Sequence, residues 1–436
     1  MAANPLDRHA ASMPGTDSIW NEMMDSFTNP EIQKCPFPFI ARLHESAPVY
    51  QDPISHFFIV SRFDDIAYVS AHPEIFSNKT EVILGGKNVP GADRIQALYE
   101  AEGFPRFHTL VTNDPPSHTQ FRMIVDKVFA PSFVKSLEPY ITQLANDLID
   151  DFIDQKNVDI QQQYCIRLPM YVISDQVGVP RQDWHRIKKW SDASVGLINP
   201  ALDIEERLKL CRIHIDLQQY LAETRKRYLA EPADSYFSRL ATAEVDGVRL
   251  TEEQFVNVAE QLLVAGNETT TGAIGHAIAH LIRNPDMADT LRQNPELVIN
   301  FTEEVLRVHA PSPHLYREAL EDVELSGVAI PKGSTIMLSY LAGNHDPSRY
   351  EDPDMIKLDR PGIRNHLAFG RGIHFCIGNQ LARAELRIAV ATLLKRVKDM
   401  RFDPDYPEPG FAPIYHVHSI DGLHVTLTPA GEAVGA

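Results

Sequence analysis

Apolar residues recur at spacings of three and four along most of the chain, which is the pattern of amphipathic helices. The pattern is clearest between residues 117 and 311, and it returns over residues 379–397. Short runs rich in β-branched and aromatic residues predict strands within residues 57–63, 322–340 and 422–429. Many helices with a few small antiparallel sheets indicate an α+β fold that is mostly α.

Two segments near the N-terminus lack the helical spacing of apolar residues. Residues 1–30 lack periodicity and are expected to be a loose N-terminal segment, followed by a single domain over residues 31–430. Residues 80–112 are rich in Gly and Pro and predict a long irregular connection. Connections of that length in compact proteins tend to be functional.

One long helix is predicted near the middle of the chain. Thr251 and Gln254 match a capping box at its start, and Asn284-Pro285 ends it after Arg283. About 30 residues at about 1.5 Å each span about 45 Å, enough to cross the molecule. Its centre, LLVAGNETTTGAIG at residues 262–275, holds three Gly and three Thr, although Gly costs about 1 kcal/mol relative to Ala inside a helix.

Charge and cysteine content exclude several classes of protein. The formal net charge of −18 argues against a nucleic-acid partner and against an anionic membrane surface. No apolar run has the length of a signal peptide core or a membrane span, so we expect a cytoplasmic protein, and a monomer. The four cysteines are far apart and indicate neither a disulfide framework nor a cysteine zinc site.

The most specific segment is AFGRGIHFCIGNQLA, residues 368–382. A lone Cys is more often an inert, packed thiol than a reactive one. Here, however, Cys376 follows two glycines and precedes a helix, whose amides and positive end favour the thiolate. The string from Phe369 to Gly378 resembles the signature of the cytochrome P450 superfamily, the haem-thiolate monooxygenases. The resemblance implies the fold of that family, with haem between the long central helix and the helix after Cys376.

The resemblance also implies the cofactor contacts. Cys376 is the implied ligand of the haem iron, and a thiolate in that position favours O–O cleavage. Haem carries two propionates, so basic side chains are expected beside it. The residues implied to bind the cofactor are His118, Arg122, Arg317, His374 and Phe369.

Glu304 and Arg307 lie three residues apart on one predicted helix. On a protein surface such a pair is worth only a few tenths of a kcal/mol. Its position matches the E-x-x-R pair of the family, in which a third arginine joins from a later meander. Arg360 is the candidate here, although KLDRP replaces the more usual Phe-Asp context. The implied role of the three residues is a buried charge network that fixes the cysteine loop.

The weak centre of the long helix matches the acid-alcohol pair of the family. Gly266 leaves room for dioxygen, Thr269 is implied to hydrogen-bond it, and Glu268 is implied to deliver protons, although many relatives have Asp there. An ordinary buried Thr beside a surface Glu is the alternative interpretation.

Substrate contacts are expected from four segments and are mainly apolar. They comprise Val89, Ile95, Leu98 and Phe107, then Leu263 and Ala265, then Pro313 and Leu315, and Val417. The polar groups Arg106, His314, His416 and His418 occur in the same segments, and terpenoid, aromatic and fatty-acid substrates all stay open.

The resemblance implies oxygen insertion from O2 into a small organic substrate, by hydroxylation or oxidative demethylation. Soluble bacterial relatives receive electrons from NAD(P)H through a ferredoxin reductase and a ferredoxin. Arg371, Arg383 and Arg387 are candidates for a basic docking patch, and a solvated helix face is nearly as good an explanation. A peroxide-driven peroxygenase and a non-catalytic haem sensor are the alternatives.

Overall fold

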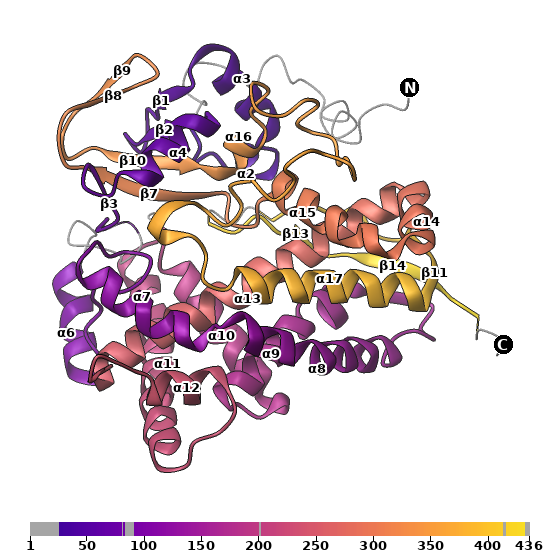
Figure 1. Cartoon of the computed structure of the whole chain (residues 1–436), viewed down its shortest axis with the longest axis horizontal. Coiled ribbons are helices and arrows are strands. Elements are labelled where there is room, and N and C mark those ends of the chain that lie inside the picture. The colour runs from indigo at the N-terminus through magenta and orange to yellow at the C-terminus, as the bar shows by residue number, and fades with distance from the viewer. Residues whose placement is uncertain (1–25, 81, 83–90, 200–201, 413–415, 432–436) are drawn as a thin grey trace.

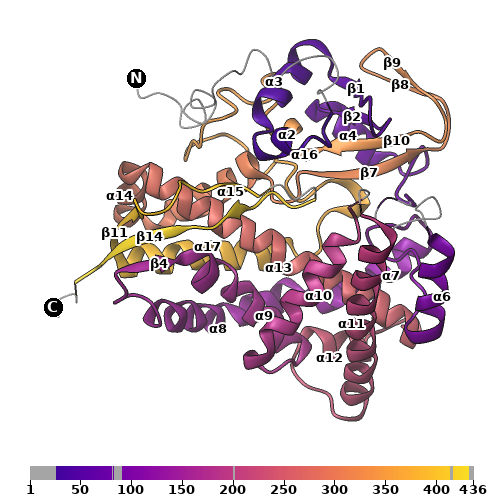
Figure 2. The same ribbon diagram turned by 180° about the vertical axis from the view of Figure 1, so that it is seen from behind.

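The computed structural model describes residues 26–80, 82, 91–199, 202–412 and 416–431. Figures 1 and 2 show one part built around a sheet and another part built from helices, with α13 (Glu252–Arg283) and α17 (Asn379–Arg396) running side by side between them. The other α-helices are α2 (Pro30–Lys34), α3 (Phe37–Ser46), α4 (Phe63–Ala71), α6 (Ala92–Glu102), α7 (Ser117–Val128), α8 (Pro131–Asp150), α9 (Arg167–Val177), α10 (Trp184–Gly196), α11 (Ile204–Ala230), α12 (Tyr236–Thr242), α14 (Pro285–Gln293), α15 (Val298–His309) and α16 (Tyr340–Asn344). Short helices of other types are η2 (Gln161–Cys165), η3 (Arg181–Asp183), η4 (Pro295–Leu297) and η5 (Gly372–His374).

The largest sheet has five strands in the order β1-β2-β10-β7-β3, and a three-stranded sheet has the order β11-β14-β4. Within the described residues there are also three two-stranded ribbons. The pairs are antiparallel as expected, except that β2 and β10 pair in parallel. The strands are β1 (Val49–Gln51), β2 (Phe58–Val60), β3 (Phe76–Ser77), β4 (Asn157–Asp159), β5 (Glu244–Val245), β6 (Val248–Arg249), β7 (His314–Ala319), β8 (Val323–Leu325), β9 (Val328–Ile330), β10 (Thr335–Ser339), β11 (Val397–Phe402), β12 (Gly410–Phe411), β13 (Ile420–Asp421) and β14 (His424–Pro429).

The long helix α13 has the limits that its end signals predict. The Thr251 hydroxyl accepts from the Gln254 amide (3.2 Å), and the Gln254 side chain accepts from the Thr251 amide (2.9 Å), so both halves of the capping box form. The helix stops at Asn284, directly before the proline that starts α14. Its C-terminal half packs into the main hydrophobic core with α8, α15 and α17.

Two predictions about the N-terminal region are corrected. Residues 80–112 contain α6, which the sequence hid because its exposed face is broad and its flanks are rich in Gly and Pro. Residues 1–25 lie outside the described residues, but order begins before residue 31. Ser26 is fully buried and donates to the Asp52 carboxylate (2.9 Å), and Asn29 caps α2. Of the helices that the structure describes, none is both long and apolar enough to cross a membrane.

Candidate active site

The loop before α17 presents Cys376. Gly370 and Gly372 have φ of 65° and 69°, a region that side chains with a Cβ rarely adopt. Gly372 also has no room for a side chain, because a Cβ there would lie 2.2 Å from the Ser70 carbonyl oxygen. The Cys376 amide donates to the Phe369 carbonyl (2.9 Å) and closes the loop. The glycines therefore fix the backbone that carries the thiol.

The environment of the thiol corrects one expectation. The backbone amides of Gly378 and Asn379, and the charges of Arg122 and Arg383, lower the pKa of Cys376 as expected at a helix start. Desolvation is the larger effect, and it raises the pKa overall. Burial therefore opposes the thiolate that the start of the helix favours.

A cluster of four basic side chains forms beside the loop. The His118 and His374 rings lie 4.2 Å apart, and the Arg122 guanidinium donates to the Phe375 carbonyl (2.7 Å). Burial, followed by the charges of Arg317, His118 and Arg122, lowers the pKa of His374 to about 2. Arg317 is 2% exposed, and no carboxylate of the described residues forms an ion pair with it. A buried cation without a counter-charge is costly, so this cluster is suited to an anionic ligand.

On the central helix, Ala265 and Gly266 are exposed although Leu263 and Asn267 on either side are buried. A Cβ added at Gly266 would meet no atom within 4 Å. The Thr269 hydroxyl donates to the Ala265 carbonyl (2.8 Å), a bond that leaves its lone pairs free to accept. The helix therefore presents backbone and a hydroxyl, without bulky side chains, to an open space.

The other two glycines of this stretch have a different role. A Cβ at Gly272 would lie 2.8 Å from the His418 carbonyl oxygen, and one at Gly275 would lie 2.7 Å from Gln161 Oε1. Both glycines allow neighbouring segments to pack closely on α13. Only Gly266 opens the helix to space.

Glu268 lies between α13 and α10. Its side chain is 17% exposed and lies 3.5 Å from the Lys188 ammonium, which also bonds Asp192 at the protein surface. Burial raises the pKa of Glu268, and the nearby Lys188 charge opposes that shift. The Glu268 side chain is therefore mostly buried rather than a fully exposed surface carboxylate, and its role in proton delivery stays a prediction.

The structure brings Glu304, Arg307 and Arg360 into one buried network. Arg307 Nε lies 2.6 Å from Glu304 Oε1, and Arg360 Nε lies 2.9 Å from Glu304 Oε2. Both side chains of the helical pair are fully buried. The remaining guanidinium hydrogens bond backbone carbonyls of the segment that precedes the cysteine loop, namely those of Asn344, Glu351, Asp352, Pro353 and Met355. The network thus ties α15 to the meander.

A second network was not predicted. Glu303 is 2% exposed on its side chain and bonds the Arg383 guanidinium of α17 (2.7 Å) and the buried His366 ring (3.1 Å). These partners lower the pKa of Glu303 to about 2, against the effect of burial. Since His366 and Arg383 flank the cysteine loop, Glu303 joins α15 directly to that loop. The adjacent Glu303-Glu304 pair was the only signal in the sequence.

The predicted docking patch does not form as expected. Arg383 bonds Glu303, and Arg387 bonds Glu138 (2.7 Å), so both cations have carboxylate partners. Arg371 stacks over the Phe63 ring, 5.3 Å from its centroid. The charges of Arg383 and Arg387 are therefore compensated by carboxylates, whereas Arg371 contacts an aromatic ring.

Several predicted substrate contacts are placed elsewhere. Leu263 is fully buried in the core of the helical part, about half a turn away from Ala265, so it faces protein. Leu98 and Ile95 pack between α6 and α11 against Leu197 and Ile215. Val89 lies outside the described residues.

The other residues predicted to contact substrate differ in burial and in their neighbours. Leu315 is partly buried, Pro313 and Val417 are buried, and Phe107 packs at the edge of the helical core. The Arg106 guanidinium lies 3.9 Å from the Glu260 carboxylate, the His314 and His416 rings lie 5.1 Å apart, and His418 belongs to a separate buried cluster.

Glu385 was not predicted either, and it gives a test by pH. This side chain of α17 is 3% exposed, and burial raises its pKa to about 8 despite a hydrogen bond with Thr270 of α13. An unfolded Glu ionises near pH 4, so between about pH 4 and pH 8 the folded protein binds the extra proton and loses stability as pH rises, by about 1.4 kcal/mol per unit at most. We expect Glu385→Gln to melt at a higher temperature than wild type at pH 8 and to lose that advantage at pH 5. Equal differences in melting temperature at the two pH values would contradict the buried, protonated carboxyl.

The comparisons with known proteins agree on one family. A family model described as "Cytochrome P450" matches residues 203–405. The chain is 34% identical over 365 residues to "Cytochrome P450 109" of Bacillus spizizenii, covering 82% of this chain and 84% of that protein. It is 33% identical over 411 residues to "Linalool 8-monooxygenase" of Pseudomonas putida, covering 92% of this chain and 98% of that protein. The chain belongs to the cytochrome P450 family.

Solved P450 structures share the fold. The structure of "Cytochrome P450 CYP109Q5 from Chondromyces apiculatus" superimposes with a TM-score of 0.81 at 31% identity, covering 93% of this chain and 98% of that one. The mostly helical α+β fold expected from the sequence is thereby confirmed, and so is the assignment to the monooxygenases.

Haem is the cofactor that this P450 family implies, and the residues of the chain fit it. Cys376 supplies a sulfur on a loop whose backbone is fixed by the Cys376–Phe369 hydrogen bond, the buried Arg317 with His118, Arg122 and His374 suits two carboxylates, and no side chain fills the space at Gly266. These residues come from four segments far apart in the sequence.

Proposed function

We propose that this P450 inserts one oxygen atom from O2 into a small, mainly apolar organic substrate, by hydroxylation or oxidative demethylation. The proposal assigns haem b to the site, with Cys376 as its iron ligand and Phe369 beside it. It also assigns NAD(P)H as the source of electrons, which pass through a ferredoxin reductase and a ferredoxin in the cytoplasm. The observation that carries it is the exposed stretch of α13 at Ala265 and Gly266, with the Thr269 hydroxyl and the Glu268 carboxyl close behind it. When bound, haem supplies the iron at which dioxygen is reduced and cleaved.

Residues of α13 provide a hydrogen-bonding hydroxyl and a route for protons on the open face of the helix. The Thr269 hydroxyl exchanges its bond to the Ala265 carbonyl for one to an incoming oxygen, so it can donate at the open face. Glu268 takes up a proton from solvent, which reaches it beside the Lys188–Asp192 pair and the half-exposed Asp192, and passes it inward. Burial raises the pKa of Glu268, so its carboxyl keeps its proton to a higher pH than an exposed Glu does.

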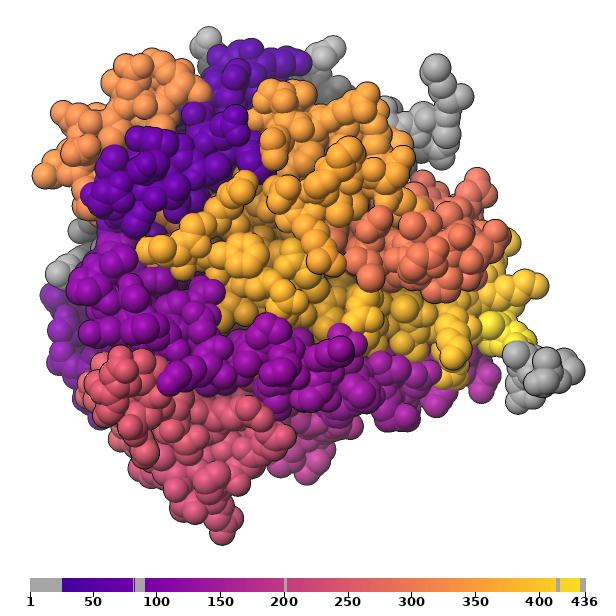
Figure 3. Space-filling view, viewed as in Figure 1, coloured from indigo at the N-terminus to yellow at the C-terminus, as the bar shows by residue number. Residues whose placement is uncertain are grey.

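The ferredoxin is expected on the face that carries the cysteine loop. In Figure 3, the orange and yellow segment around α17 reaches the surface between the indigo and purple parts of the chain. Because Arg383 and Arg387 are paired with carboxylates, we expect docking there to depend on shape and on the exposed Phe375 and Ile373 as much as on charge.

The substrate class that we favour is terpenoid. One relative is named for 8-monooxygenation of linalool, and a solved neighbour with a TM-score of 0.76 at 30% identity holds testosterone; other solved neighbours hold a fatty acid on an acyl carrier protein and an ethylphenyl phosphate. The linalool relative has the greater identity and covers 92% of this chain, so it guides the choice. The paired His314 and His416 rings provide a polar point among apolar residues such as Leu315 and Val417.

The test uses coupling of electrons to product. We expect Thr269→Ala to retain haem and to consume NAD(P)H in the ferredoxin system while releasing hydrogen peroxide, with product per NAD(P)H reduced by more than tenfold. Glu268→Gln is expected to slow turnover without a comparable release of peroxide. A panel of candidate substrates is first titrated into the haem-containing protein, and binding is followed by the spin-state change in the Soret band. Linalool is the first substrate used for turnover.

Thr271→Ala is the matched control, because Thr271 is buried on another face of the same helix. Wild-type coupling in Thr269→Ala would contradict the relay. Activity with peroxide and none with ferredoxin would favour the peroxygenase instead, and stable haem binding without either activity would favour a sensor.

A further inference from the structure

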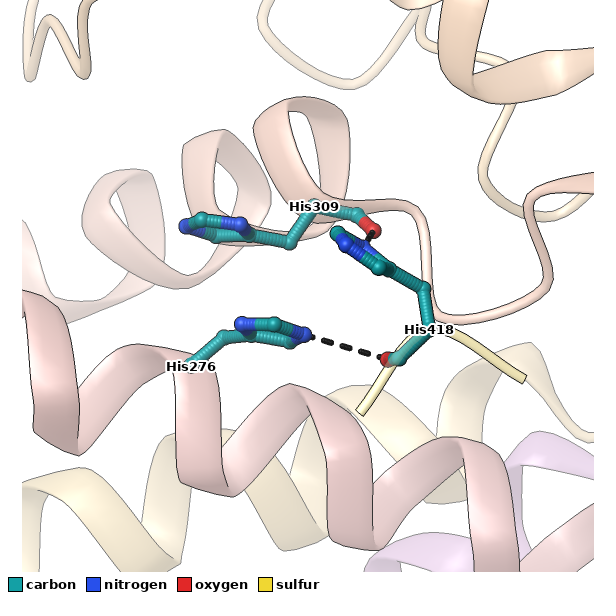
Figure 4. Close-up of side chains that lie close together, drawn as sticks. All are labelled: His276, His309 and His418. Carbon is teal, nitrogen blue, oxygen red and sulfur yellow. Dashed lines mark hydrogen bonds between the residues drawn. The ribbon is translucent and has the colours of Figure 1, made fainter. Parts of the chain in front are cut away.

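Three histidines from separate segments meet in the core, away from the cysteine loop. Figure 4 shows His276 on α13, His309 at the end of α15, and His418 on the segment before β13. The His276 and His309 rings are stacked, with centroids 4.3 Å apart and planes at 3°, and the His418 ring lies 4.8 Å from His276. One ring nitrogen of each residue lies within 4.8 Å of the others. All three side chains are buried, none being more than 8% exposed.

Backbone carbonyls determine which ring nitrogens carry hydrogen. His418 Nδ1 donates to the His309 carbonyl (2.5 Å), and His276 Nε2 donates to the His418 carbonyl (3.1 Å), because a carbonyl oxygen can only accept. His418 Nε2 and His276 Nδ1 then carry lone pairs. Metal-binding histidines show this arrangement, in which one nitrogen donates to a carbonyl and orients the other toward the ion.

Two nitrogens of the cluster lack any hydrogen bond within the described residues. These are His309 Nδ1 and His418 Nε2, both buried. A buried polar atom left without a partner costs about 1–3 kcal/mol, so packing alone gives a poor reason for three histidines here.

We propose that His276, His309 and His418 bind one transition-metal ion of the zinc type, separate from the haem iron. Imidazole nitrogens suit zinc, copper and nickel, whereas calcium and magnesium need oxygen ligands, which the three residues do not offer. Three protein ligands leave the fourth tetrahedral position for water. The nitrogens must draw in to about 3.3 Å from one another for bonds of about 2.0 Å. Because the lone pair of an imidazole lies in the ring plane and the His276 and His309 rings are nearly parallel, binding requires at least one of these two rings to rotate out of the stack.

Such an ion would join three parts of the fold. It would link α13, the helix that carries the E-x-x-R pair, and the C-terminal segment next to Val417, which is a predicted substrate contact. The glycine at 272 already brings the His418 segment directly onto α13. Occupancy is therefore expected to raise the melting temperature as free zinc rises, as for any ligand that binds only the folded state.

The experiment loads zinc into the purified haem-containing protein after removal of loose metal with a chelator. We expect one zinc per chain by mass spectrometry of metals, counted separately from iron, and a melting temperature that rises with zinc. His309→Phe and His418→Gln are expected to weaken zinc affinity by more than tenfold. His280→Gln is the matched control, because His280 lies one turn later on α13 and outside the cluster.

X-ray absorption at the zinc edge keeps the test decisive where a variant fails to fold. Wild-type protein should show nitrogen ligands at about 2.0 Å, several of them imidazoles, and no sulfur. Absence of stoichiometric zinc in the folded wild-type protein, zinc bound equally by the cluster variants, or a sulfur-containing shell would each overturn the proposal.

Discussion

Cys376→Ala is expected to abolish dioxygen-dependent monooxygenase activity completely. Cys376 is the only sulfur on the loop that Gly370 and Gly372 shape. The hydrogen bond from its backbone N–H to the Phe369 carbonyl fixes the position of the sulfur. Alanine removes the sulfur and leaves that backbone in place, so the fold should persist while iron ligation by thiolate is lost. The measurement is the reduced carbon-monoxide complex, whose strongly red-shifted Soret band reports a thiolate ligand.

Cys35→Ala is the matched control for this prediction. Cys35 is also partly exposed, yet it follows the short helix α2, far along the chain from the cysteine loop. The control should keep the red-shifted band, the haem content and the turnover of the wild type. Persistence of the red-shifted band in Cys376→Ala would refute the assignment of the ligand.

The limits of the central helix could be predicted because its end signals are local. A capping box needs only Thr251 and Gln254, and the stop needs only the Asn284-Pro285 pair, so no distant contact decides either end. The glycines of the cysteine loop are equally local, since their positive φ angles are a property of each residue. Signals of this kind are complete in a few neighbouring residues.

Burial of charge could not be predicted in the same way. Glu303 and Glu304 are adjacent acidic residues on a helix, a pattern that is normally exposed, yet both are buried because Arg360 and Arg383 reach them from later segments. Arg360 was found only through the resemblance to the family, and Arg383 was assigned to a docking patch although it neutralises Glu303. A sequence shows charges but not which of them the fold pairs.

Neighbouring elements also decide which residue of an apolar stretch is exposed. Leu263 and Ala265 both occur in the apolar run of α13, and periodicity gives no reason to prefer one as the open position. The surrounding helices cover Leu263 and leave Ala265 exposed. The histidine cluster is a stronger case, because His418 lies 109 residues after its hydrogen-bond partner His309 and only the folded chain brings them together.

Glu304→Gln is expected to destabilise the fold more than any other single change proposed for this chain. The substitution leaves Arg307 and Arg360 charged and buried without a carboxylate, and breaking a buried ion pair in this way costs about 3–5 kcal/mol. Since a domain is stabilised by only about 5–15 kcal/mol, we expect a much lower melting temperature and early loss of haem on heating. Arg307→Lys should be nearly as damaging, because one ammonium cannot replace the five bonds of the guanidinium to Glu304 and to backbone carbonyls.

The control for this prediction breaks an ion pair of similar length at the surface. Glu138→Gln removes the partner of Arg387, and both of those side chains are about one-third exposed, so the expected cost is below about 1 kcal/mol. Melting curves followed by haem absorbance and by circular dichroism separate cofactor loss from unfolding. If Glu304→Gln melted within a degree or two of Glu138→Gln, the buried network would not be what holds α15 to the meander, and the cysteine loop would depend chiefly on Glu303, His366 and Arg383 instead.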